Sequence, residues 1–352
     1  MDQRRDQLCH WINKQLNQLN LYQGSSLPLA VVSGDASFRR YFRCHYPVAE
    51  KAGSVICVDA PPDKEDNRQF AKIAQQFAAA GVPVPQLLAT DFDQGFMMLS
   101  DLGDCLLKHV LSSDNVDNFF AIAFSQLLQI MEADFSQAPL PKYEGAKLQQ
   151  EMELFRHWFC GEFLQLDLTQ PQQQCLTDCF DFLERQALQQ TQVPVHRDFH
   201  TRNLMVMAEG QLGVIDFQDA VVGPVSYDLL SLLRDETFPS WPETQVKQWV
   251  LDFAHLLRKQ GICSPTDQQF WFDFNAIGAQ RHLKVAGIFA RLHYRDNKAG
   301  YLQHTPQSLK YLMAELRQLA PSAPDCVAEL ERWLQNTVVP CLNRALQQGS
   351  KP

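Results

Sequence analysis

The spacing of hydrophobic and polar residues predicts a strand-rich beginning of the chain. Apolar residues recur at α-helical spacing over residues 4–20, which predicts a first helix. Two short apolar runs, 29–33 and 40–46, flank a segment of small residues and predict a β-hairpin. A third strand is expected at 55–58.

The pattern then continues with one more helix and two more strands. Residues 63–80 carry apolar side chains with the α-helical period, and Gly81 ends that predicted helix. Apolar runs at 87–90 and 96–99 predict two strands around a polar turn. The first hundred residues are therefore expected to form mostly sheet plus one helix.

Helical periodicity dominates the rest of the chain. One predicted hairpin, with strands at 204–207 and 212–215, interrupts it. Helices are expected at 115–132, 148–159, 171–190 and from 227 to the end. The pattern thus predicts an α+β protein with a small strand-rich lobe followed by a larger helical lobe.

Length, composition and charge narrow the class of protein. The 352 residues exceed the usual size of a single compact core, which favours two lobes. Apolar residues make up 45% and charged residues 20%, as in ordinary folded proteins. Forty acidic and 31 basic residues give a net charge of -9, which repels a polyanion, so we expect no nucleic-acid partner.

The cysteines and the N-terminus predict a cytoplasmic protein. The ten cysteines lie far apart except Cys175 and Cys179, whose spacing suits one helix face better than a zinc site or a disulfide framework. The first residues are polar and charged, unlike a signal peptide, and no apolar run is long enough to span a bilayer. We therefore expect a reducing cytoplasm and no membrane association.

The motif richest in chemistry lies around the predicted hairpin. Residues 195–206 and 214–217 read VHRDFHTRNLMV and VIDF. They resemble the catalytic core of kinases, in which a first Asp accepts the proton of the attacking hydroxyl and an Asn and a later Asp bind magnesium. The resemblance implies that Asp198 is catalytic and that Asn203 and Asp216 are metal ligands. Their oxygen donors suit Mg²⁺.

Simpler interpretations of the same residues remain. Taken alone, His196-Arg197-Asp198 is compatible with an ordinary turn, and Asp216 with a surface carboxylate at the end of a strand. The fixed offsets between these residues around a hairpin favour a kinase. His196 and His200 are compatible with a metal pair only on a helix, and this segment is predicted to be a loop. We expect His196 to be a packed histidine that supports the loop and His200 to lie near the phosphates.

The next motif limits the size of the acceptor. Asp228 follows Asp216 closely, which leaves no room for a long activation segment that docks a polypeptide, so a small acceptor is expected. His200 lies two positions after the base, where aminoglycoside and choline kinases carry histidine. In the kinase fold the equivalent of Asp228 braces the catalytic loop through hydrogen bonds. The alternative interpretation is that Asp228 is simply a charge at a helix N-terminus.

These motifs imply a protein-kinase-like two-lobed fold, with residues 1–103 as the nucleotide-binding lobe and 104–352 as the catalytic and substrate-binding lobe. ATP and Mg²⁺ are the implied cofactors. The segment around Gly34 corresponds to a phosphate-binding loop, although it contains a single glycine, and Ser100 corresponds to the adenine-binding hinge. The predicted nucleotide-binding residues are Gly34, Ala36, Ser37, Arg39, Ser100, Leu102 and His200.

One element of the kinase pattern is missing. The third strand of kinases ends with a lysine for the phosphates, and this chain has Val58 and Asp59 there. Another cation is needed, or magnesium and the backbone hold the triphosphate. The candidate cations are Arg39, Arg40 and Lys64.

The sequences of three segments are more specific than the general kinase pattern. Residues 34–43 read GDASFRRYFR, 59–62 read DAPP and 280–285 read QRHLKV. They resemble the bacterial N-acetylmuramate/N-acetylglucosamine anomeric kinases of the aminoglycoside phosphotransferase superfamily, a resemblance that extends over most of the chain. It implies ATP-dependent phosphorylation of the anomeric hydroxyl of an amino sugar during peptidoglycan recycling.

A predicted helix over residues 270–294 offers candidate substrate contacts. Arg281 and Lys284, followed by Arg291 and Arg295, recur on roughly one face, where a cation can meet the lactyl carboxylate of N-acetylmuramate. A solvated basic face explains the same pattern. Asp273 is a candidate acceptor for a sugar hydroxyl, and the aromatic residues around it are expected to be core.

Two other functions stay open. A kinase of an aminoglycoside or a choline-like amino alcohol fits the same scaffold and the acidic composition. A nucleotide-binding pseudokinase is suggested by the absent lysine, although Asp198, Asn203 and Asp216 argue against it. The sequence indicates no obligate protein partner.

Overall fold

The computed structural model describes residues 2–34, 38–48 and 52–349. The chain forms two compact units, which are described separately below. Unit 1 comprises Met1–Pro139 and Arg202–Asp219, and unit 2 comprises Leu140–Thr201 and Ala220–Pro352. These units divide the chain differently from the predicted functional lobes, 1–103 and 104–352, which stay a prediction.

Unit 1 is built around a five-stranded antiparallel sheet with the order β1-β2-β3-β5-β4. The five predicted strands all occur near their expected positions. They are β1 (Ala30–Gly34), β2 (Arg40–Pro47), β3 (Ala52–Asp59), β4 (Leu87–Asp91) and β5 (Phe96–Ser100).

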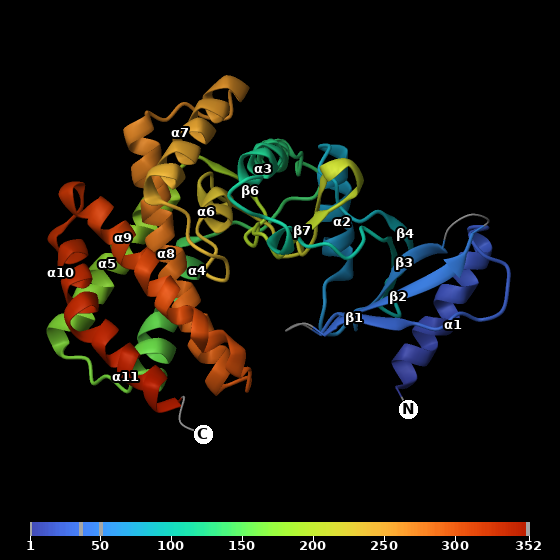
Figure 1. Ribbon diagram of the computed structural model, residues 1–352, viewed down its shortest axis with the longest axis horizontal. Helices are drawn as coiled ribbons and strands as arrows, with labels where there is room; N and C mark the ends of the chain where they lie inside the picture. The colour runs from blue at the N-terminus through green and yellow to red at the C-terminus, as the bar shows by residue number, and fades with distance from the viewer. Residues whose placement is uncertain (1, 35–37, 49–51, 350–352) are drawn as a thin grey trace. The chain divides into compact units, whose positions relative to one another are not determined.

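Two helices complete the strand-rich part of unit 1, and both confirm the apolar spacing of the sequence. α1 (Gln3–Gln18) runs beside the sheet (Figure 1). Its Leu8, Ile12 and Leu16 are buried in one core with side chains of the sheet. α2 (Asn67–Ala79) starts four residues later than predicted because the Asp66 side chain accepts a hydrogen bond from the N–H of Gln69 and caps the helix.

The predicted hairpin of the motif region belongs to unit 1. It pairs β7 (Leu204–Val206) with β8 (Leu212–Val214). The N–H of Val206 bonds to the carbonyl of Cys105 at 2.7 Å, and the N–H of Val214 bonds to the carbonyl of Pro83 at 2.7 Å. α3 (Val116–Glu132) packs beside it, so the hairpin is fixed to the first part of the chain on two sides.

Unit 2 is mostly helical. Its central element is α8 (Asp267–Tyr294), whose 28 residues are largely buried against several other helices (Figure 1). The expected aromatic core is confirmed, because Phe270 and Phe274 are fully buried. The other α-helices of unit 2 are α4 (Gly145–Leu154), α5 (Gln170–Gln189), α6 (Tyr227–Leu233), α7 (Glu243–Gln260), α9 (Thr305–Leu319), α10 (Asp325–Trp333) and α11 (Val339–Gly349).

A two-stranded sheet in unit 2 was not predicted. β6 (Gln192–Val195) pairs antiparallel with β9 (Val221–Pro224). Each strand has four residues and includes a proline, so neither produces a clear β pattern in the sequence. β6 ends one residue before His196 and therefore sets the start of the catalytic motif.

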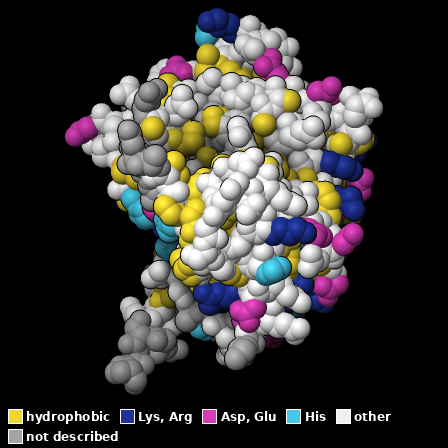
Figure 2. Space-filling view, turned by 90° about the vertical axis from the view of Figure 1, so that its right-hand side faces the viewer, with side chains coloured by type: hydrophobic (Ala, Val, Ile, Leu, Met, Phe, Trp, Pro, Cys, Tyr) yellow, Lys and Arg dark blue, Asp and Glu magenta, His cyan; other side chains and the backbone are white. Residues whose placement is uncertain are grey.

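The surface charges, the helices and the cysteines each bear on an expectation from the sequence. On the face drawn in Figure 2, basic and acidic side chains of the described residues are interspersed rather than gathered by sign. In the part of the chain that the structure describes, no helix combines the length and apolar character needed to cross a membrane. All ten cysteines are free thiols.

Candidate active site

The two predicted metal ligands meet at the open end of the β7–β8 hairpin in unit 1. The N–H of Ile215 bonds to the carbonyl of Asn203 at 3.0 Å, which extends the hairpin pairing by one step. As a result, Asn203 Nδ2 donates to Asp216 Oδ2 at 3.2 Å. Gln218 Nε2 donates to the other oxygen of Asp216 at 2.7 Å. The hairpin therefore brings Asn203 and Asp216 together as the sequence predicts.

The chemistry of this pair fits a magnesium ion. Asp216 and Asn203 are half-buried and supply a carboxylate and an amide oxygen, which are hard donors. The described residues contain no cluster of three or more His, Cys, Asp or Glu that forms a complete metal site. Mg²⁺ commonly keeps water and phosphate oxygens beside one or two protein ligands, so a two-residue site is sufficient.

Aromatic packing ties Asp216 to α2. Phe217 follows Asp216, is fully buried and stacks on Phe70 of α2 with ring centroids 4.9 Å apart. The guanidinium carbon of Arg39 lies 4.9 Å from the centroid of the Phe70 ring, and Arg39 Nη2 lies 3.2 Å from Glu65 Oε2. Because Arg39 is only 2% exposed, it is a buried cation packed against the same Phe70 ring that contacts Phe217, the neighbour of Asp216.

The end of β3 carries an anion where kinases carry a lysine. Asp59 is fully buried, and its carboxylate accepts from Arg4 Nε at 2.9 Å and from Arg40 Nε at 3.0 Å. Of the three candidate cations, Arg40 is therefore engaged with Asp59. Lys64 is half exposed and lies 3.6 Å from Asp63. Arg39, paired with Glu65, is the candidate that lies buried against α2.

The remaining nucleotide-binding predictions in unit 1 stay untested. Gly34 is the last residue of β1, while Ala36 and Ser37 lie outside the described residues. Ser100 ends β5, and its backbone and hydroxyl are both bonded to the backbone of Gln86. Leu102 follows in a turn, and its side chain lies near Gly213 of β8.

The turn that contains Leu102 has a defined internal structure. Arg43 of β2 donates to both oxygens of Asp101, at 2.6 and 3.0 Å. Asp101 also accepts from the N–H of Gly103 at 3.0 Å, and Gly103 adopts a φ of +95° that favours glycine. The turn is thus held from the sheet side by one arginine.

The predicted catalytic base lies in unit 2 on a braced loop. Asp228, at the start of α6, is fully buried and accepts from the N–H of His196 at 2.6 Å and the N–H of Arg197 at 2.9 Å. Burial raises the pKa of Asp228, although these hydrogen bonds oppose the rise. The prediction that Asp228 braces the loop is confirmed.

Fixed cations keep the Asp198 carboxylate ionised. Burial alone would raise the pKa of Asp198, but the positive fields of Lys284, His200 and Arg281 outweigh it and lower the pKa below its usual value. A carboxylate with a lowered pKa is a weak base that is always available as a hydrogen-bond acceptor near neutral pH. The surroundings of Asp198 therefore favour orientation of a hydroxyl over strong proton abstraction.

The two histidines of the motif serve the loop differently. The Nδ1 of His196 accepts from the N–H of Asp198 at 3.2 Å, and its ring meets Phe199 edge-on, which confirms the packed histidine. His200 is also buried, and its field acts on Asp198. Its predicted role at the phosphates stays a prediction.

The basic face predicted on α8 is divided in the structure. Arg281 is buried in an ion pair with Glu236, and the Lys284 side chain is only 11% exposed. The alternative of a solvated basic face is wrong for these two residues. Arg295 is exposed and pairs with its neighbour Asp296 at 2.8 Å, so the solvated description fits that end of the helix.

Asp273 lies apart from these cations. It precedes Lys284 by eleven residues on α8, which is about three helical turns or 16 Å. Its carboxylate accepts from Gln269 at 2.8 Å, and burial raises its pKa to about 6. The structure therefore does not bring Asp273 together with Arg281 and Lys284, and its contact with a substrate stays a prediction.

Comparison with known proteins decides the family. The profile described as "Phosphotransferase enzyme family" matches residues 28–262. The chain belongs to this family. It is 40% identical to the N-acetylmuramate/N-acetylglucosamine kinase of Pseudomonas putida, over 88% of this chain and 91% of the relative. It is 39% identical to the kinase of the same name from Neisseria meningitidis, over 92% of this chain and 94% of the relative.

Solved structures confirm the predicted protein-kinase-like fold. A choline/ethanolamine kinase family protein from Mesorhizobium loti matches with a TM-score of 0.57 at 13% identity, covering 92% of this chain and 99% of that one. The ADP-bound aminoglycoside phosphotransferase APH(2'')-Ib matches with a TM-score of 0.51 at 17% identity, covering 85% and 96%. The predicted class, a small-molecule phosphotransferase with a hydroxyl acceptor, is confirmed by the family and its relatives.

Sequence reasoning missed several carboxylates of this phosphotransferase. Glu151, Glu236 and Glu65 each pair with a cation that the motifs singled out, but none lies within a motif. The pairing of Asp59 was predictable from the sequence, since a carboxylate at the end of an apolar strand requires a cationic partner when it is buried. The others gave no signal, because their partners are distant in sequence.

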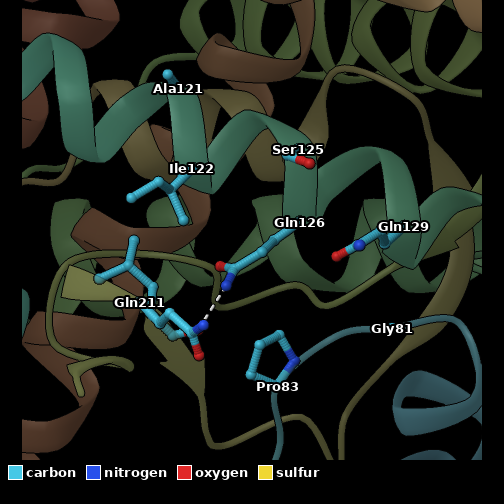
Figure 3. Close-up of a pocket in the computed structure, with 9 residues that line it drawn as sticks. Gly81, Pro83, Ala121, Ile122, Ser125, Gln126, Gln129 and Gln211 are labelled. Atoms are coloured by element: carbon cyan, nitrogen blue, oxygen red, sulfur yellow. Dashed lines mark hydrogen bonds between the residues drawn. The ribbon is translucent and has the colours of Figure 1, made fainter. Parts of the chain in front are cut away.

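A pocket in unit 1 of this phosphotransferase carries none of the predicted site residues. It is a cavity of about 410 Å³ in unit 1, next to α3 and the β7–β8 hairpin (Figure 3). Its lining includes Gln126, Gln129 and Gln211, and Gln126 donates to the carbonyl of Leu212. No residue predicted to bind nucleotide, metal or substrate lines it, and its lining is uncharged.

Proposed function

We propose that the protein transfers the γ-phosphoryl group of ATP to the anomeric hydroxyl of N-acetylmuramate or N-acetylglucosamine, which yields the sugar 1-phosphate. The observation that carries the proposal is the 3.2 Å contact of Asn203 and Asp216 at the end of the hairpin. The names of the two relatives support the choice of sugar. A role in peptidoglycan recycling in the cytoplasm follows from the same resemblance.

Asp198 orients the acceptor in this proposal. Its ionised carboxylate accepts a hydrogen bond from the attacking hydroxyl and takes the proton as the new P–O bond forms, while the bond from the γ-phosphorus to the bridging oxygen breaks and ADP leaves. The anomeric hydroxyl is more acidic than other sugar hydroxyls, so a carboxylate with a lowered pKa is adequate. Asp198 and Asn203 belong to one loop, five positions apart, which limits their separation to about 18 Å even when extended.

Asn203 and Asp216 are the residues that we propose to hold Mg²⁺. When bound, the ion supplies positive charge that offsets the negative charge on the transferred phosphoryl group. Gln218 and Asn203 orient the Asp216 carboxylate through the two hydrogen bonds described above. The protein thus contributes a fixed carboxylate with two amide neighbours.

The nucleotide is proposed to be ATP. The residues proposed to bind it are those predicted from the sequence: Gly34, Ala36, Ser37, Arg39, Ser100, Leu102 and His200. The solved phosphotransferase APH(2'')-Ib, which shares the fold, is bound to ADP. Arg39 is the proposed phosphate cation in place of the strand lysine. Arg39 lies buried beside α2, where it pairs with Glu65, so a phosphate group would share this cation with that carboxylate.

The substrate cations are not free to act as an unbalanced positive patch. Arg281 is paired with Glu236, and Lys284 lies 3.3 Å from Glu151. A lactyl carboxylate therefore meets two cations whose charge is already largely offset. We infer that N-acetylglucosamine, which lacks that carboxylate, is accepted as well as N-acetylmuramate.

Phosphorus NMR of the product tests the proposal. The purified protein is incubated with ATP, Mg²⁺ and N-acetylmuramate, and the expected product is a phosphate monoester coupled to the anomeric proton. The Asp198→Asn variant is the control and should form this product at least about 100-fold more slowly. A phosphate on another hydroxyl would refute the anomeric assignment. Turnover only with an aminoglycoside or choline would replace the assignment of an amino sugar as the substrate. ATP binding without turnover of any acceptor would support a pseudokinase.

A further inference from the structure

The backbone just before the catalytic aspartate is held in an unusual conformation. Arg197 has a φ of +76°, in the left-handed region that residues other than glycine rarely adopt. Such a conformation costs free energy and persists only where surrounding contacts enforce it. Because Asp198 follows directly, the contacts of Arg197 also set the direction of the catalytic carboxylate.

The side chain of Arg197 is anchored by unit 2 itself. Arg197 Nη2 donates to Glu151 Oε1 of α4 at 2.8 Å. The guanidinium carbon lies 5.0 Å from the ring centroid of Tyr143. Together with the two backbone hydrogen bonds to Asp228, these contacts hold Arg197 at both its main chain and its side chain.

Glu151 is built to remain an anion at this place. It is 5% exposed, its carboxylate accepts from the hydroxyl of Tyr143, and Lys284 Nζ lies 3.3 Å away. Burial alone would raise the pKa of Glu151, but Lys284 and Arg197 outweigh it and lower the pKa. One carboxylate therefore links α4, the catalytic loop and α8.

A connection through Lys284 strengthens the case. Lys284 contacts Glu151, donates to the hydroxyl of Tyr227 at 3.2 Å and exerts the largest of the cationic fields that lower the pKa of Asp198. Glu151 thus fixes both the residue that precedes the base and the ammonium group that keeps the base ionised.

We propose that Glu151 is a positioning residue for Asp198, acting through Arg197 and Lys284. In kinases that are switched on by phosphorylation, an acquired phosphate pairs with arginine and orders the activation loop. Glu151 supplies a permanent negative charge to the arginine of the same motif, so this kinase needs no modification to hold its catalytic loop. The proposal rests on the proposed function only in taking Asp198 as the base.

Exchange of the charge tests the proposal. Glu151→Gln keeps the shape of the side chain and removes its charge. With N-acetylglucosamine, which has no carboxylate to meet Lys284, we expect kcat to fall about 10- to 100-fold because the base is misplaced, with KM for ATP and for this sugar nearly unchanged. The matched control is Glu153→Gln on the same helix, since Glu153 is 47% exposed and pairs with Arg156 at the surface. Its kcat should equal that of the unmodified enzyme.

A double variant separates positioning from general stability. If Glu151 acts in part through Arg197, the variant that combines Glu151→Gln with Arg197→Met should lose less kcat than the product of the two single losses, because the part that runs through Arg197 is shared. Losses that multiply, or an unchanged kcat in folded Glu151→Gln, would overturn the proposal. Circular dichroism and melting curves establish folding. If Glu151→Gln fails to fold, Arg197→Met decides alone, and an unchanged kcat there overturns the proposal.

The same measurements distinguish this proposal from the proposed function. If the unmodified protein phosphorylates a different small molecule, kcat for that acceptor replaces kcat for the sugar and the comparison keeps its meaning. Loss of the amino-sugar assignment therefore leaves the role of Glu151 testable.

Discussion

Asp216 of unit 1 and Asp198 of unit 2 have the same side chain but lie in opposite surroundings. In unit 1, neutral amides of Asn203 and Gln218 donate to Asp216. In unit 2, Asp198 lies in the fields of Lys284, Arg281 and His200. A carboxylate beside neutral donors keeps its charge for an external cation, whereas one beside fixed cations has that charge balanced internally. Surroundings, more than residue type, distinguish the proposed metal ligand from the proposed base.

Replacement of the base should give the largest effect. Asp198→Asn removes the proton acceptor while its size is kept. We expect kcat to fall about 100- to 10,000-fold with ATP binding retained, as measured by steady-state kinetics and calorimetry. Loss of ATP binding together with kcat would show that Asp198 belongs with the nucleotide rather than the acceptor.

Replacement of the metal carboxylate should be nearly as severe but different in kind. Asp216→Asn is expected to lower kcat about 100-fold or more and to require a higher Mg²⁺ concentration for half-maximal activity. Calorimetry should also show that Mg²⁺ no longer strengthens ATP binding. An unchanged magnesium requirement would contradict the assignment of Asp216 to the metal.

Removal of the buried cation of unit 1 should weaken nucleotide binding selectively. Arg39→Met is expected to raise KM for ATP about 10- to 100-fold, the value of one charge-assisted hydrogen bond, without changing KM for the sugar. Lys64→Met, which removes a half-exposed cation, is the control and should leave both constants unchanged. A larger effect of Lys64→Met than of Arg39→Met would reverse the choice between the two cations.

The smallest expected effect is a shift in pH dependence. The groups that act on Asp198 are Lys284, His200, Arg281, His196 and Asp228. Lys284→Met removes a cation, so the pKa of Asp198 should rise. Because activity requires the ionised base, the acidic limb of the kcat–pH profile should move to higher pH. An acidic limb that stays in place in a folded variant would show that Lys284 acts on the substrate alone.

The sequence predicted those parts of the site that depend on neighbours along the chain. Asp198, Asn203 and Asp216 follow fixed spacings around a hairpin, and the hairpin was visible as two apolar runs. The partners of Arg197 and Arg281 were not predictable, since Glu151 and Glu236 lie 46 and 45 residues away and become neighbours only when helices pack. β6 and β9 were missed for a related reason, because four residues with a proline form a strand only when a partner is present.

The division of the chain into units has a consequence for its synthesis on the ribosome. Residues 202–219 complete unit 1, although residues 140–201 belong to unit 2 and are made first. The N-terminal sheet therefore emerges without the hairpin that carries the proposed metal ligands, and residues 140–201 of the helical unit follow before that hairpin exists. Neither unit can be obtained by a single truncation, because each consists of two separate stretches of the chain.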